Sequence, residues 1–159
     1  PQSLFSIPYC LTIGVQFIGG FILDKVSKFV KYLNDVNLRM FEKTQDGEMV
    51  IFKSSYTFCN EQKVFIIIFD NSAYTQVLCR LARLDNPAKT EKMLYLLNEL
   101  NAKYKQLKFI IDDEGNVDFS IDYVALDEDF NCQLFLAIVF SIFKNVESEY
   151  SKFMRIIWA

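Results

Sequence analysis

The second half of the chain decides the fold. Residues 86–103 read NPAKTEKMLYLLNELNAK, residues 107–124 read LKFIIDDEGNVDFSIDYV, and residues 127–158 read DEDFNCQLFLAIVFSIFKNVESEYSKFMRIIW. These stretches predict, in order, a helix, a two-stranded hairpin and a long final helix. Asn86 suits the N-cap of the first helix because its side chain accepts a free backbone N–H, and Pro87 fits the first helical position, where its missing N–H costs nothing.

The hairpin carries the clearest alternating pattern in the chain. Its buried face is expected to hold Leu107, Phe109 and Ile111 before the Asp-Glu-Gly-Asn turn at 113–116, and residues 117, 119, 121 and 123 after it. Asp118 and Asp122 fall on the opposite face. This period of two predicts a pair of strands with one face packed and the other acidic and wet.

The final helix is apolar nearly all round, since residues 130–143 carry no charged side chain. One buried stripe runs through Phe135, Val139, Ile142, Val146, Tyr150 and Phe153. A second apolar face holds Leu136, Phe140 and Phe143. Such a helix must be covered on both sides, and its uncharged run over residues 130–143 is too short to span a membrane. Either an N-terminal arm or a second subunit would supply the second cover, and we favour a homodimer whose interface is built around these three residues.

The first half of the domain predicts an amphipathic helix over residues 22–36 and then four strands. The strands are expected near residues 38–42, 49–58, 64–69 and 73–84, with a tight turn at Asp46-Gly47. The whole order is α-β-β-β-β-α-β-β-α. Strands joined by short turns run antiparallel, so the predicted class is α+β, a single antiparallel sheet covered by helices.

Residues 1–23 contain no charged side chain. The stretch is long enough to cross a bilayer, but Pro8, Gly14, Gly19 and Gly20 interrupt it, and no basic residue precedes it as in a signal peptide. We therefore interpret residues 1–20 as an uncharged arm that packs on the domain or as non-native residues. A membrane or targeting segment over residues 1–23 and an arm that docks an undefined partner are the alternatives. The domain proper is residues 21–159.

The composition excludes several chemistries. The chain has no His, which rules out Ser-His-Asp and Cys-His catalysis. A net charge of −3 without a basic excess disfavours a nucleic-acid partner. The four cysteines, Cys10, Cys59, Cys79 and Cys132, form no metal-binding spacing, and we expect buried free thiols in a reducing cytoplasm.

Two acidic clusters, at residues 112–114 and 127–129, are the remaining candidates for chemistry. They leave open a divalent-cation-dependent enzyme. The first cluster begins like a calcium loop, but Tyr123 stands where a bidentate Glu is required. We interpret the clusters as a solvated turn and a helix cap, and Lys25, Lys28 and Lys31 as a solvated helix face. No catalytic residue, cofactor or metal is predicted.

Several of these residues resemble the bacterial YbjN domain. The resemblance lies in Asn86-Pro87, the Leu-Leu-Asn-Glu-Leu-Asn stretch at 96–101, the turn at 112–115 and the Tyr-Ser-Lys-Phe-Met stretch at 150–154. It covers roughly residues 21–159. It implies a fold similar to that of type III secretion chaperones, which are small, usually dimeric cytoplasmic proteins that hold extended segments of clients. Some members of the family are described as sensory-transduction regulators.

Together, these observations predict a non-enzymatic, cytoplasmic protein-binding module. We expect a chaperone-like or regulatory role and a homodimer. We also expect a protein client or regulator as the partner, which the sequence does not identify.

Overall fold

The computed structural model describes residues 22–159, so the predictions for residues 1–20 lie outside its described part. Its elements are α1 (Ile22–Asp35), β1 (Glu42–Asp46), β2 (Met49–Phe58), β3 (Glu61–Phe69), β4 (Tyr74–Arg83), a 3-10 turn η1 (Pro87–Lys89), α2 (Thr90–Lys103), β5 (Leu107–Ile111), β6 (Asn116–Val124) and α3 (Cys132–Trp158). The predicted order of helices and strands is confirmed.

The six strands form one sheet in the order β1-β2-β3-β4-β6-β5, and every neighbouring pair is antiparallel. Three hairpins build the first four strands. The chain then crosses through η1 and α2 to β5 at the far edge, and β6 returns between β5 and β4.

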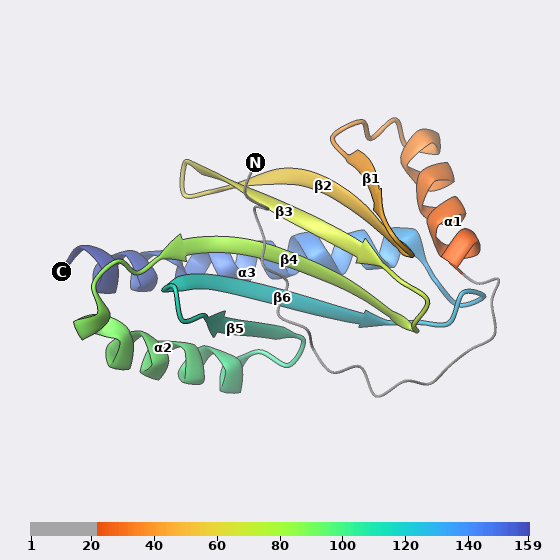
Figure 1. Ribbon diagram of the computed structural model, residues 1–159. Helices are drawn as coiled ribbons and strands as arrows, with labels where there is room; N and C mark the ends of the chain where they lie inside the picture. Colours follow the sequence, from red (N-terminus) through yellow and green to blue (C-terminus); the bar gives the residue numbers. More distant parts are fainter. Residues whose placement is uncertain (1–21) are drawn as a thin grey trace.

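The three helices lie on one side of this sheet, and Figure 1 shows α3 running behind it. They share one core with the strands, in which phenylalanine rings meet edge to face: Phe29, Phe65, Phe119, Phe135 and Phe143 are fully buried. Each such ring buries a large apolar area in a defined orientation. The opposite face of the sheet carries no described helix.

The second apolar face of α3 is packed within the chain itself. Leu136 is 5% exposed and Phe143 is fully buried. The centroid of the Phe143 ring lies 4.9 Å from that of Phe65 and 5.6 Å from that of Phe119, both on the sheet. Both α1 and α2 also contact α3. The buried side of α3 therefore includes residues of both predicted apolar faces, because the sheet, α1 and α2 cover this helix together.

The turns explain several boundaries. Cys59 and Asn60 adopt φ of 48° and 71°, which is the two-residue hairpin geometry that joins strands with a right-handed twist. β3 therefore begins at Glu61, earlier than predicted.

Gly115, in the turn between β5 and β6, has φ +80°, and the Leu84 amide donates to the Gly115 carbonyl at 2.7 Å. At the end of α3, Trp158 is 81% exposed.

Candidate protein-binding surface

On the helix-free face of the sheet, apolar side chains run along β3 and have one apolar neighbour on β2 and one on β4. The strand register places Ile51 opposite Ile68 and Ile66 opposite Leu78 on this face. Val64, on the same face of β3, is 38% exposed. Ile66 and Ile68, at the centre of this apolar band, are each 6% exposed. Antiparallel sheets commonly carry polar side chains on the face that no helix covers, so an apolar band here is unusual, and its exposed end at Val64 marks a surface for association.

The other half of this face is ionic. Arg80 on β4 donates to both carboxylate oxygens of Asp118 on β6, at 2.9 and 3.2 Å, and these bonds raise the pKa of the arginine. Lys108 on β5 pairs with Asp122 at 3.3 Å. Cross-strand pairs of opposite charge stabilise a sheet modestly. The acidic face predicted for the hairpin is thus present and is neutralised by neighbouring cations.

The β5 edge of the sheet is closed by a side chain. The Asn101 amide, from α2, donates to the Phe109 carbonyl at 3.0 Å and accepts from the Phe109 amide at 2.7 Å. It reproduces the two bonds that a neighbouring strand would make. Edge strands left bare invite pairing with other chains, so Asn101 removes that option at this edge.

At the opposite edge, β1 covers only part of β2. Its register ends at Glu42 opposite Lys53, whereas β2 continues to Phe58 and pairs with β3 along its full length. We call residues 54–58 the open half of β2. Before Glu42 the chain turns aside, and the Ser54 hydroxyl donates to the Met40 carbonyl at 2.8 Å.

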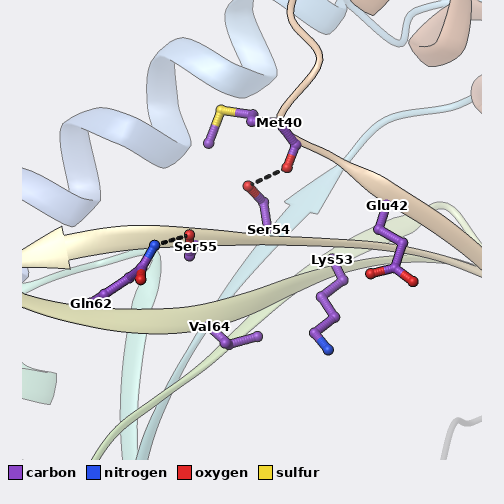
Figure 2. Close-up of a pocket in the computed structure, with 7 residues that line it drawn as sticks. All are labelled: Met40, Glu42, Lys53, Ser54, Ser55, Gln62 and Val64. Carbon is purple, nitrogen blue, oxygen red and sulfur yellow. Dashed lines mark hydrogen bonds between the residues drawn. The ribbon is translucent and has the colours of Figure 1, made fainter.

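A cavity of about 330 Å³ lies beside the first residue of β1, as Figure 2 shows. The residues lining it come from the segment that leads into β1, from the first residue of β1, and from β2 and β3: Met40, Glu42, Lys53, Ser54, Ser55, Gln62 and Val64. Gln62 donates to the Ser55 hydroxyl at 2.7 Å across its floor. The lining combines one opposite-charge pair of residues with apolar and hydroxyl groups, which suits a polypeptide segment better than a charged small molecule.

The first acidic cluster builds a turn. Asp112 accepts bonds from the backbone amides of Glu114 and Asn116 and from the Asn116 side chain, at 2.8–3.0 Å. Partial burial opposes ionisation of Asp112, but the bonds from Asn116 and Glu114 outweigh it and lower its pKa. These hydrogen bonds give the Asp112 carboxylate a structural role in the turn, which does not require a bound metal ion.

The second acidic cluster meets the lysine row of α1. The Lys25 side chain is 2% exposed, and its ammonium group donates to the Ser72 carbonyl at 3.0 Å and lies 3.7 Å from the Asp127 carboxylate. Loss of solvation lowers the pKa of Lys25 in spite of this partner. Lys28 donates to the Asp127 carbonyl. The lysine row predicted as a solvated face is therefore partly buried and fastens α1 to the loop before α3. Within residues 22–159, no three side chains of metal-binding type converge.

A buried carboxylate joins α2 to α3. Glu149 on α3 is 3% exposed and accepts bonds from Lys103 and Tyr104, at 2.5 and 2.8 Å, and from Lys152 at 2.8 Å. Burial alone would raise its pKa, but the bonds from Lys103, Lys152 and Tyr104 lower it to about 2. Sequence reasoning missed Glu149, because an isolated Glu on a helix gives no sign of being buried.

The cysteines divide between core and surface. Cys79 and Cys132 are buried thiols, and burial raises the pKa of each. Cys59 is exposed in the β2–β3 turn, so the prediction that it is buried was wrong. Cys59 is at the surface because it lies in the hairpin turn. The apolar residues before it in the sequence suggested a buried strand instead. Cys10 lies outside the described residues.

Among the three predicted interface residues, only Phe140 is accessible. Its ring packs on Phe143 at 5.9 Å and on Tyr56 of the open half of β2 at 6.3 Å, and both Phe140 and Tyr56 are half-buried. Leu136 and Phe143 belong to the core. The homodimer stays a prediction, and Phe140 is the member of the trio that a partner could reach.

No protein-family model and no curated protein matches this chain. The structure is similar to a chain of the crystal structure of the ExsC–ExsE complex, with a TM-score of 0.57 and 14% sequence identity over 83% of this chain and 96% of that chain. The predicted fold class is confirmed as an α+β fold with one antiparallel sheet covered by helices, and the likeness to type III secretion chaperones stays a prediction. Membership of the YbjN family stays a prediction. In residues 22–159, no helix is both long and apolar enough to cross a membrane.

Proposed function

We propose that this protein is a non-catalytic, chaperone-like module that holds an extended segment of a client polypeptide. The client lies on the helix-free face of the sheet. A regulatory role through the same surface is a variant of this proposal, because a regulator would also act by occupying the face. The expected site of action is the cytoplasm.

The apolar band on the helix-free face is the observation that carries the proposal. Val64, Ile66 and Ile68 form a row along β3, with Ile51 of β2 opposite Ile68 and Leu78 of β4 opposite Ile66. A flat strip with a row of ion pairs beside it matches an extended segment with apolar side chains on one face. The fold likeness supports this reading, since the similar chain was crystallised as part of a complex.

Selection from a displayed random-peptide library, followed by calorimetry on the enriched peptides, tests this function. Leu78→Glu puts a carboxylate in the middle of the band and should weaken binding of those peptides at least about tenfold, or about 1.4 kcal/mol. Leu78 is half-buried in the open face, so the folded state should tolerate the change, and circular dichroism checks that it does.

Leu94→Glu is the matched control. Leu94 is 50% exposed on α2, on the helical side of the molecule, so the same chemical change there should leave peptide affinity unaltered. Failure to enrich any peptide, or equal loss of affinity in the two variants, would refute a binding site on the helix-free face.

A further inference from the structure

The open half of β2 has backbone groups that no described strand uses. The two-residue turn closes on the bonded pair Phe58 and Glu61, so even-numbered residues of β2 bond to β3 and odd-numbered residues point outward. The β1 register uses the outward groups only as far as Lys53. Among the described residues, no strand pairs with the amides and carbonyls of Ser55 and Thr57, and we take these groups as the place where a further strand can bind.

The other two edges of the sheet are protected against a second copy of this chain. Asn101 already occupies the backbone of Phe109 on β5. On β1, antiparallel pairing of two copies around Thr44 would place Glu42 opposite Asp46 twice. Like charges directly opposite each other destabilise a strand pair.

The open half of β2, in contrast, is complementary to itself. Its residues, Ser-Ser-Tyr-Thr-Phe at 54–58, carry no charge. Antiparallel pairing of two copies around Tyr56 places Ser55 opposite Thr57, with the outward groups of both residues facing each other. Each copy then donates and accepts the same bonds, as a two-fold interface requires.

The helical side of this edge adds apolar contact at the same place. The Tyr56 ring packs on Phe140 and, at 5.0 Å, on Phe143. A two-fold axis through Tyr56 would bring the half-buried Tyr56 and Phe140 rings of both copies together. Aromatic residues of this kind are enriched at the centres of protein interfaces.

We infer that a second copy of this chain pairs antiparallel with the open half of β2, around a two-fold axis at Tyr56. The two six-stranded sheets become one continuous sheet, and the Phe140 rings lie beside the axis. The cavity beside the first residue of β1 (Figure 2) lies next to the open half of β2. The helix-free face stays available on each copy.

Cysteine crosslinking tests the register. Residue 56 of one copy would lie directly opposite residue 56 of the other, at a Cα separation of about 4.5 Å, which a disulfide can bridge. In a background with Cys10→Ser and Cys59→Ser, Tyr56→Cys should form a disulfide-linked dimer under mild oxidation. The matched control Thr57→Cys should not, because residue 57 faces residue 55 of the other copy.

Two measurements on the unaltered chain keep the inference testable if these variants fold poorly. Light scattering at micromolar concentration should give twice the 18.6 kDa chain mass, and hydrogen exchange should show the Ser55 and Thr57 amides protected in a concentration-dependent way. A monomer overturns the inference. So does a dimer in which both amides exchange fast, or protection that is independent of concentration, which would mean another segment occupies the edge. Binding of a client peptide to the helix-free face would be unaffected by any of these results.

Discussion

At the scale of single residues, Gly115 is held by a backbone contact that admits no side chain. A Cβ at this position would lie 2.3 Å from the Leu84 carbonyl oxygen, in a backbone region with φ +80°. Gly115→Ala should therefore lower the free energy of unfolding by at least about 2 kcal/mol, because strain and steric clash add. Urea denaturation measures the change.

Gly47 provides the control for that substitution. It has φ +58°, and a Cβ there would meet no atom within 4 Å. Gly47→Ala should cost only the left-handed backbone strain, about 1 kcal/mol. Equal losses at the two glycines would contradict the role assigned to the Leu84 contact.

Glu149 makes stability depend on pH in a defined direction. Glu149→Gln should lower the free energy of unfolding at neutral pH by about 1–3 kcal/mol, since bonds to charged groups are lost. The folded-state pKa of about 2 lies below the ordinary value of 4.5. The contribution is therefore fully present above pH 4.5 and disappears as the pH falls toward 2. Urea curves for the two proteins should accordingly converge on acidification, whereas Glu128→Gln, at an exposed site, should change little at any pH. A gap that persists unchanged at pH 3 would argue against a depressed pKa.

At the scale of elements, the β5 edge depends on one side chain. Asn101→Ala removes both bonds to the Phe109 backbone and should destabilise the domain by about 1–2 kcal/mol. Asn101→Asp keeps the acceptor and loses the donor, so it should fall between wild type and Asn101→Ala. Hydrogen exchange at the Phe109 amide should accelerate most in Asn101→Ala. Unchanged exchange there would show that the edge is closed by something else.

The elements also show what the sequence could and could not predict. The alternation in residues 107–124 identified the hairpin, and Asn86, which caps the 3-10 turn η1 leading into α2, identified the helix, because both signals are local. The second apolar face of α3 was harder to interpret. Helical periodicity shows that Leu136 and Phe143 need cover, but the cover comes from strands and helices distant in sequence. The hydrogen bonds of Glu149 with α2 and those of Asn101 with β5 could not be predicted either, because folding alone brings the partners of these residues near.

At the scale of the whole molecule, association should depend on Phe140. Phe140→Asp should give a folded monomer, because the ring is half-buried at the edge of the core and the charge would face a second copy. Light scattering measures the mass, and circular dichroism confirms the fold. Leu134→Asp is the control: Leu134 is 50% exposed in the first turn of α3, away from the Tyr56 contact, and should leave the mass unchanged. A Phe140→Asp protein with the mass of the wild type would place the interface elsewhere.

Trp158 is the only tryptophan in the chain, and its indole already stands in water in the folded protein. Its fluorescence should resemble that of the free amino acid before and after denaturation, so emission scans would miss the unfolding transition altogether. Replacing Phe135, which lies among the rings of Phe29, Phe69 and Tyr123, with tryptophan would give the core an optical reporter.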